Sequence, residues 1–200
     1  QVAALLAPLF DLPGRSPLPL PVQRDLIPCP GAQVTQTMDV TQSKLCLGFT
    51  TPITNRTEQY PAMQLLNQVF GAGMTSKLFT NLREKQSLCY SIGSGYYGSK
   101  GILTVSAGID SAQRDRVQAG ILHQLQLCAQ GEITPGELEN AKQGLLSGLR
   151  AAHDSPGAIE SYYSGGVLSG LQLSPEEAMA RIQAVTLPQL CRAAQSVRLH

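Results

Sequence analysis

The sequence predicts an α+β protein, a two-layer sandwich in which helices pack on one face of a mainly antiparallel sheet. Long runs typical of strands, with alternating apolar and polar residues, lie within residues 34–109. Two of these runs are separated by a short Gly-Ser-Lys turn, as in a hairpin. From residue 111 onwards the chain carries repeated helix-start signals instead. The order β, α, α, β, β and then helices favours a sheet covered on one side.

The first 31 residues differ from the rest of the chain. Residues 1–10 are apolar and typical of the end of a helix. Residues 11–31 are rich in proline, which removes backbone donors and prevents regular helix; these prolines are Pro13, Pro17, Pro19, Pro21, Pro28 and Pro30. We expect residues 1–31 to be the tail of a preceding domain and a linker, and residues 32–200 to be the domain itself.

The first strand is predicted at residues 44–50, where Lys-Leu-Cys-Leu-Gly-Phe-Thr alternates in polarity before Pro52. Thr57 is the residue type that caps a helix, and we expect that helix to continue to about Phe70. Its apolar positions follow helical spacing; they are Met63, Leu66, Val69 and Phe70.

Gly71 and Gly73 are expected to end this helix and form a tight turn. A second, short helix is predicted at residues 76–85, capped by its first residue, Ser76. Residues 88–97 and 101–109 then form the two strands of the hairpin.

The last part of the chain is predicted to be helical, beginning with a helix at about residues 111–130. Thr134-Pro135-Gly136-Glu137 and Ser174-Pro175-Glu176-Glu177 each combine an N-cap hydroxyl, a proline and a carboxylate three residues after the hydroxyl. Both are capping boxes and predict firm helix starts. Ser155-Pro156 and Thr186-Leu187-Pro188-Gln189 are weaker signals of the same kind, and Val197-Arg198-Leu199-His200 is typical of a strand start.

Composition excludes two classes of partner. The chain has 15 Lys and Arg against 14 Asp and Glu, a net charge of +1, and no basic cluster. Proteins that bind nucleic acid or an anionic membrane need concentrated positive charge. No apolar run approaches the ~20 residues of a membrane-spanning helix. We expect no nucleic acid and no membrane as partner, and a cytoplasmic protein.

Histidine and cysteine patterns argue against a metal site in this chain. The three histidines, His123, His153 and His200, are far apart and form no His-x-x-Glu-His motif or its reverse. The five cysteines, at positions 29, 46, 89, 128 and 191, have no paired spacing. We expect them to be buried, reduced thiols.

Nucleotide binding and a serine hydrolase are two alternative functions that the sequence also argues against. Residues 71–77, Gly-Ala-Gly-Met-Thr-Ser-Lys, lack the order of a phosphate-binding loop, and the chain has no Gly-x-Ser-x-Gly elbow.

Arg83 and Tyr90 are the candidate site residues. A guanidinium group presents a fixed fork of donors to carbonyl or carboxylate oxygens, and a tyrosine hydroxyl can donate to a developing oxyanion. Residue types alone favour a plainer interpretation. In that case Arg83 belongs to a solvated helix face and Tyr90 fills a half-buried strand position.

Residues 70–91 read Phe-Gly-Ala-Gly-Met-Thr-Ser-Lys-Leu-Phe-Thr-Asn-Leu-Arg-Glu-Lys-Gln-Ser-Leu-Cys-Tyr-Ser. This run resembles the signature of the second, non-zinc-binding half of the pitrilysin/insulinase-like, or processing-peptidase-like, zinc metallopeptidases. That signature has a glycine-rich break, a helix of the type Leu-Phe-x-x-Leu-Arg-Glu-Lys, and x-x-Leu-x-Tyr-Ser. The chain departs from it at Ala72, where a third glycine often occurs, and at Gln86-Ser87, where a basic residue and glycine are frequent. Residues 39–49 resemble the opening strand of the same half.

The resemblance implies an α/β sandwich that encloses a chamber together with a related, zinc-bearing half. It implies that Arg83 binds substrate and that Tyr90 stabilises the transition state from across the chamber. This fragment would hold no cofactor, and zinc would lie in the partner half of an active assembly. The leading hypothesis is therefore a non-catalytic, substrate-binding half of a zinc metalloendopeptidase, with a peptide substrate. The alternative is a catalytically inert structural or assembly module with the same fold, and the histidine count argues against a self-sufficient enzyme.

Overall fold

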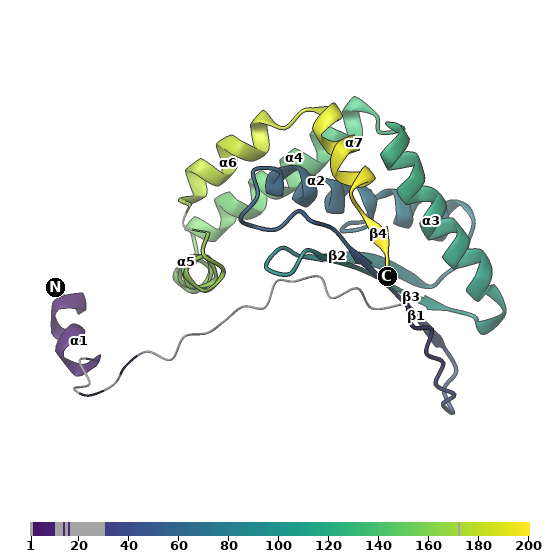
Figure 1. Cartoon of the computed structure of the whole chain (residues 1–200), viewed down its shortest axis with the longest axis horizontal. Coiled ribbons are helices and arrows are strands. Elements are labelled where there is room, and N and C mark those ends of the chain that lie inside the picture. The colour runs from purple at the N-terminus through teal and green to yellow at the C-terminus, as the bar shows by residue number, and fades with distance from the viewer. Residues whose placement is uncertain (1, 11–13, 15, 17–30, 172) are drawn as a thin grey trace.

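The computed structural model describes residues 2–10, 14, 16, 31–171 and 173–200. Helix α1 (Val2–Phe10) has no buried residue and lies apart from the other elements (Figure 1). The predicted linker falls outside the described residues, except for Gly14, Ser16 and Gly31. The boundary at residue 31 therefore stays a prediction.

A single antiparallel sheet forms one layer of the protein. Within the described residues its order is β2-β3-β1-β4, with β1 (Ser43–Thr50), β2 (Ser91–Tyr97), β3 (Ile102–Ile109) and β4 (Arg198–Leu199). β1 pairs with β3 along the full length of both strands, from Ser43 opposite Ile109 to Thr50 opposite Ile102. β2 and β3 form the predicted hairpin. The short β4, predicted as a strand start, pairs with the end of β1.

Helices cover one face of this sheet, so the predicted two-layer architecture is confirmed (Figure 1). They are α2 (Tyr60–Phe70), α3 (Arg114–Gln130), α4 (Pro135–His153), α5 (Pro156–Ser169), α6 (Pro175–Ala184) and α7 (Leu187–Gln195), with the 3-10 turn η2 (Ser111–Gln113) and the π-helix η1 (Phe79–Lys85). Apolar side chains meet between the layers, and those with 0% exposure include Phe49, Leu66, Phe70, Leu103 and Ile121. On the opposite face of the sheet, side chains such as Lys44 and Cys46 are exposed.

The predicted helix starts are confirmed by the hydrogen bonds that cap them. The Thr134 hydroxyl accepts the Glu137 N–H at 3.2 Å, and the Glu137 carboxylate accepts the Thr134 N–H at 2.7 Å. Ser174 and Glu177 form the same reciprocal pair at the start of α6. The Ser155 hydroxyl accepts one N–H at the start of α5. These local contacts fix where the covering helices begin.

The predicted cap at Thr57 is wrong. α2 begins at Tyr60, and its N-cap residue Gln59 makes no side-chain capping bond. The Thr57 hydroxyl instead donates to the carbonyl of Thr54 at 2.8 Å. The same hydroxyl accepts the Thr54 N–H at 3.2 Å, so a local turn three residues before the helix occupies it and it does not cap α2.

Candidate functional site

The glycine-rich break after α2 packs directly on strand β2. Gly71 has a φ of −155°, outside the left-handed region, and its carbonyl accepts the Ser94 N–H at 3.0 Å. A Cβ atom at Gly71 would lie 2.6 Å from the Ser94 hydroxyl oxygen, so the close approach itself requires glycine. The Ser94 hydroxyl also donates to the Asn67 side-chain oxygen at 2.7 Å. The chain thus leaves α2 from a point that is tied to the sheet.

The helix predicted at residues 76–85 exists, but it is π-helical from Phe79 to Lys85. Ser76 caps it as expected, since its hydroxyl accepts the Phe79 N–H at 3.4 Å. π-Helical turns are rare in proteins, and those that occur are often found at functional sites. Leu82 has 0% exposure and packs so closely on α3 that a Cβ atom at Gly120 would lie 3.1 Å from it. One side of η1 is therefore anchored in the core.

Arg83 lies on the outer side of η1. Its side chain is 40% exposed, and its guanidinium carbon lies 4.5 Å from the centre of the Phe79 ring. Stacking of this kind contributes ~0.5–1 kcal/mol at exposed sites and orients the guanidinium group. The ion pair with Glu84 is long, at 3.8 Å, and exposed, so it contributes little. A ligand can therefore replace Glu84 as the partner of the Arg83 guanidinium at a low cost in free energy.

A left-handed turn at Ser87 connects η1 to the sheet. Among the described residues, Ser87 is the only one other than glycine with a positive φ, of 49°. Its N–H donates to the Arg83 carbonyl at 3.1 Å, and the Leu88 N–H donates to the Leu82 carbonyl at 2.9 Å. Because the Leu88 N–H closes the helix, it cannot join a strand. The strand predicted from Leu88 is wrong at this end, and β2 begins at Ser91.

Tyr90 is the last residue before β2. Its N–H donates to the Gly108 carbonyl at 2.8 Å, which fixes its backbone against β3. Tyr90 is 62% exposed, and its hydroxyl forms no hydrogen bond with the described part of the chain. Arg83 and Tyr90 therefore flank one turn, and both reach the surface. No hydrogen bond or ring contact joins the two within the described ranges.

The residue between this turn and Tyr90, Cys89, does not compete as a nucleophile. Burial raises the pKa of the Cys89 thiol, and the nearby charge of Arg83 lowers it by less. A thiol with a raised pKa is protonated at neutral pH and unreactive.

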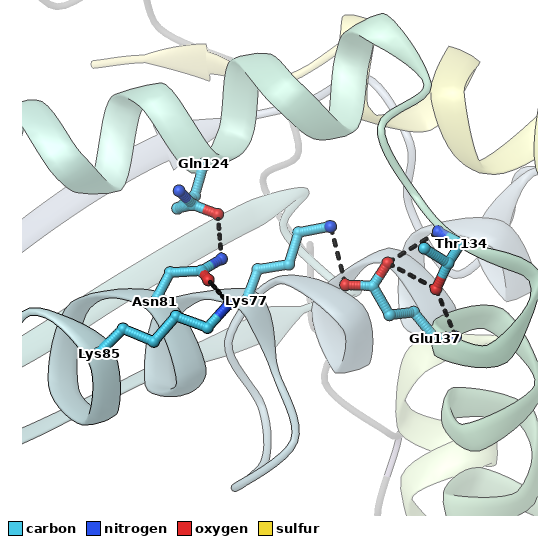
Figure 2. Close-up of polar contacts among 6 residues, drawn as sticks. All are labelled: Lys77, Asn81, Lys85, Gln124, Thr134 and Glu137. Carbon is cyan, nitrogen blue, oxygen red and sulfur yellow. Dashed lines mark hydrogen bonds and ion pairs between the residues drawn. The ribbon is translucent and has the colours of Figure 1, made fainter.

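A polar network beneath η1 was not anticipated from the sequence (Figure 2). Lys77, only 9% exposed, forms an ion pair with Glu137 at 2.7 Å. Asn81 donates to the side-chain oxygen of Gln124 at 2.8 Å and accepts from Lys85 at 3.1 Å. Sequence reasoning considered Lys77 only as part of a phosphate-binding loop and Glu137 only as a cap. The signal that it missed is the four-residue spacing of Lys77, Asn81 and Lys85, which places three polar side chains on one side of a helical segment.

Two cavities lie away from the candidate pair. One, of about 640 Å³, lies between α2, α4, α5 and α6 and includes Tyr60 and Tyr162 in its lining. The other, of about 510 Å³, adjoins Lys77 and Glu137. Neither is lined by Arg83 or Tyr90.

The described residues do not fit a metal site. No three His, Cys, Asp or Glu side chains within them lie close enough together to hold an ion. His153 Nε2 lies 3.3 Å from Glu176 Oε1 at the end of α4, as expected for a helix-end histidine. No described helix is long and apolar enough to span a membrane.

The cysteine prediction is wrong for Cys46, because every second side chain of β1 faces the uncovered side of the sheet. Cys46 is exposed, 3.6 Å from the Ser106 hydroxyl. Cys128 is buried as predicted, and burial raises the pKa of its thiol to about 12. Cys29 lies outside the described residues.

The fold and the Arg83–Tyr90 segment define the class of protein. The chain belongs to the M16, or pitrilysin/insulinase-like, peptidase family, and residues 2–145 match the domain described as "Peptidase M16 inactive domain". The resemblance of this chain to the non-zinc-binding part of the family is thereby confirmed.

Individual relatives give a more detailed comparison. The chain is 29% identical over 167 residues to "Probable inactive metalloprotease YmfF" of Bacillus subtilis, covering 84% of this chain and 39% of that protein. It is also 29% identical over 161 residues to "Uncharacterized zinc protease YmxG" of the same organism, covering 79% and 39%. A crystal structure of a conserved protein from Enterococcus faecalis is 36% identical, with a TM-score of 0.75, over 80% of this chain and 38% of that one. The chain thus spans about two-fifths of the length of these relatives.

Proposed function

We propose that this chain is the non-catalytic, substrate-binding half of an insulinase-like zinc metallopeptidase. It acts with a homologous zinc-bearing half, in the same polypeptide or in a partner chain, on a peptide substrate. The observation that carries this proposal is the exposure of Arg83 and Tyr90 on either side of the Ser87 turn, beside buried neighbours such as Leu82 and Cys89.

The two side chains suit different parts of a bound peptide. The Arg83 guanidinium, oriented by Phe79, offers several N–H donors to main-chain carbonyl oxygens. The Tyr90 hydroxyl has no acceptor within the described residues and can donate to a carbonyl oxygen as negative charge develops on it. Arg83 therefore binds substrate, and Tyr90 stabilises the transition state.

Zinc enters this proposal only through the other half. The described residues of this chain bring no set of ligands together, and the family model that they match is that of an inactive domain. In this division of labour, the chain binds and orients the peptide.

A second candidate function is an inert structural or assembly module. The relatives support both possibilities, because one with 29% identity is named an inactive metalloprotease and another with 29% identity is named a zinc protease. The two functions differ in what they require of Arg83 and Tyr90. Only a substrate-binding half needs their polar groups.

The test uses the complete protein together with its zinc-bearing half. Tyr90→Phe removes one hydrogen bond that strengthens in the transition state, so we expect kcat to fall on the order of 100-fold with little change in KM. Arg83→Ala is expected to weaken peptide binding as well. Tyr163→Phe and Arg150→Ala, two exposed side chains on α5 and α4, are the matched controls.

Melting temperatures are measured in parallel as a control for folding, and both variants should keep the wild-type value because neither removes buried volume. If both variants keep wild-type rates and peptide affinity, the inert-module function replaces this proposal. Where the other half has no zinc motif, peptide affinity is the readout, and Arg83→Ala is expected to lower it.

A further inference from the structure

Polar side chains line one face of the helical segment 77–85, which ends in η1, and Arg83 lies on the other face. Lys77, Asn81 and Lys85 are spaced by four residues, so they lie on one side of the helical segment. Arg83 is two residues from Asn81 and from Lys85, and residues two apart in a helix do not share a face. Figure 2 shows that the shared face points towards α3 and α4.

The hydrogen bonds on this face can form in only one sense. Lys85 has no acceptor atom, so its ammonium group must donate to the Asn81 side-chain oxygen, at 3.1 Å. The Asn81 amide nitrogen is then directed to the Gln124 oxygen, at 2.8 Å. Gln124 is only 5% exposed, so water competes poorly for this bond. The orientation of Asn81 against α3 is thereby fixed.

The ion pair at the start of η1 is equally constrained. The side chain of Lys77 is 10% exposed and that of Glu137 is 28% exposed, with 2.7 Å between Lys77 Nζ and Glu137 Oε1. The Glu137 carboxylate is also held by the N–H of Thr134, at 2.7 Å. Burial alone would raise the pKa of Glu137, but the hydrogen bonds from Lys77 and Thr134 outweigh it and keep the pKa below its usual value. The Glu137 carboxylate is therefore ionised at neutral pH and accepts from Lys77.

A short helix needs such contacts to hold its orientation. Seven residues are too few for an isolated helix to be stable in water. The apolar contacts of Leu82 favour burial, but the hydrophobic effect is not directional and permits small rotations. Hydrogen bonds lose most of their strength when their angles change, so they resist rotation.

We propose that Lys77, Glu137, Asn81 and Gln124 are positioning residues for Arg83. They fix the rotation of η1 about its axis and so direct the Arg83 guanidinium over Phe79 towards the substrate. This role depends on the proposed function, because it gives Arg83 a peptide to bind. It adds α3 and α4 to the elements that determine substrate affinity.

The test compares Lys77→Met with Lys142→Met in the complete protein. Lys142 is the matched control, because its ammonium group tethers α4 to the Gln183 carbonyl of α6, at 2.8 Å, and not to the helical segment 77–85. Peptide affinity is measured well below the melting temperature, where every variant is folded. We expect Lys77→Met to weaken peptide binding about as much as Arg83→Ala, and Lys142→Met to leave it unchanged. The double variant Lys77→Met/Arg83→Ala should bind the peptide no more weakly than Arg83→Ala alone, because both changes remove the same interaction, that between Arg83 and the peptide.

Amide hydrogen exchange supplies a readout that does not depend on peptide binding. We expect Lys77→Met to speed exchange at residues 79–88, and Lys77→Arg to restore the wild-type exchange and affinity. Wild-type affinity in folded Lys77→Met, or unchanged exchange at residues 79–88, would overturn the positioning role. If the wild-type protein binds no peptide, the proposed function fails, and the exchange data alone then decide whether the contacts hold η1.

Discussion

Replacement of Ser87 by glycine tests the turn that joins Arg83 to Tyr90. A residue with a side chain in the left-handed region costs ~1–2 kcal/mol relative to glycine. Glycine also gains freedom in the unfolded chain, which costs ~0.5–1 kcal/mol on folding. With φ at 49°, Ser87 carries the first cost, so Ser87→Gly is expected to stabilise the fold by about 0.5–1 kcal/mol. For a domain of this size, that is a rise in melting temperature of about 2 °C.

The matched control is Ser147→Gly, at an exposed position within α4. Here the backbone is helical, so glycine should destabilise by about 0.5 kcal/mol. Circular dichroism during urea unfolding gives both free energies, and the two substitutions should have opposite signs. A loss of stability in Ser87→Gly equal to that in Ser147→Gly would refute the left-handed turn. The change should leave peptide affinity unaltered, because it keeps the backbone path to Tyr90.

Three further predictions concern the same framework. In the folded protein the pKa of Glu137 lies below the ordinary 4.5, so its carboxylate contributes stability that is present above about pH 4.5 and is lost as pH falls through the folded pKa. Urea unfolding should therefore show a smaller difference in unfolding free energy between wild type and Glu137→Gln at about pH 3 than at about pH 6.5. An equal difference at the two pH values would contradict this prediction. Gly71→Ala should destabilise by ~1–3 kcal/mol because its Cβ meets Ser94, and Gly73→Ala, with open space around it, should cost less; equal losses would argue against the close approach. Metal analysis of the purified chain should find no stoichiometric zinc, and about one tightly held zinc per chain would overturn that expectation.

Local chemistry made most of the fold predictable. The capping boxes at Thr134 and Ser174 depend on residues within one helical turn, so the sequence alone located α4 and α6. The strand at residues 44–50 was equally clear from its alternation. The η1 segment was harder, because Leu82 packs on Gly120 of α3 and the Tyr90 N–H pairs with Gly108 of β3, and both partners lie far away in the sequence.

The candidate site was predictable only in part. Arg83 and Tyr90 were identified through the family signature, since their residue types alone favoured a plain surface role. Lys77 and Glu137 could not be paired from the sequence, because nothing local indicates that two helices will meet at those positions. Their partnership follows from the fold, which brings the first turn of α4 to the residues just before η1.

Photo-crosslinking at position 90 tests the central claim most directly. A photoreactive phenylalanine analogue replaces Tyr90 in the complete protein, and Tyr163 on α5, which is also exposed, is the control position. If this chain is a substrate-binding half, illumination should attach a bound peptide at position 90 and not at position 163, and excess unlabelled peptide should suppress the product. No product at position 90, or an equal yield at both positions, would contradict the assignment of Arg83 and Tyr90 to a peptide-binding surface.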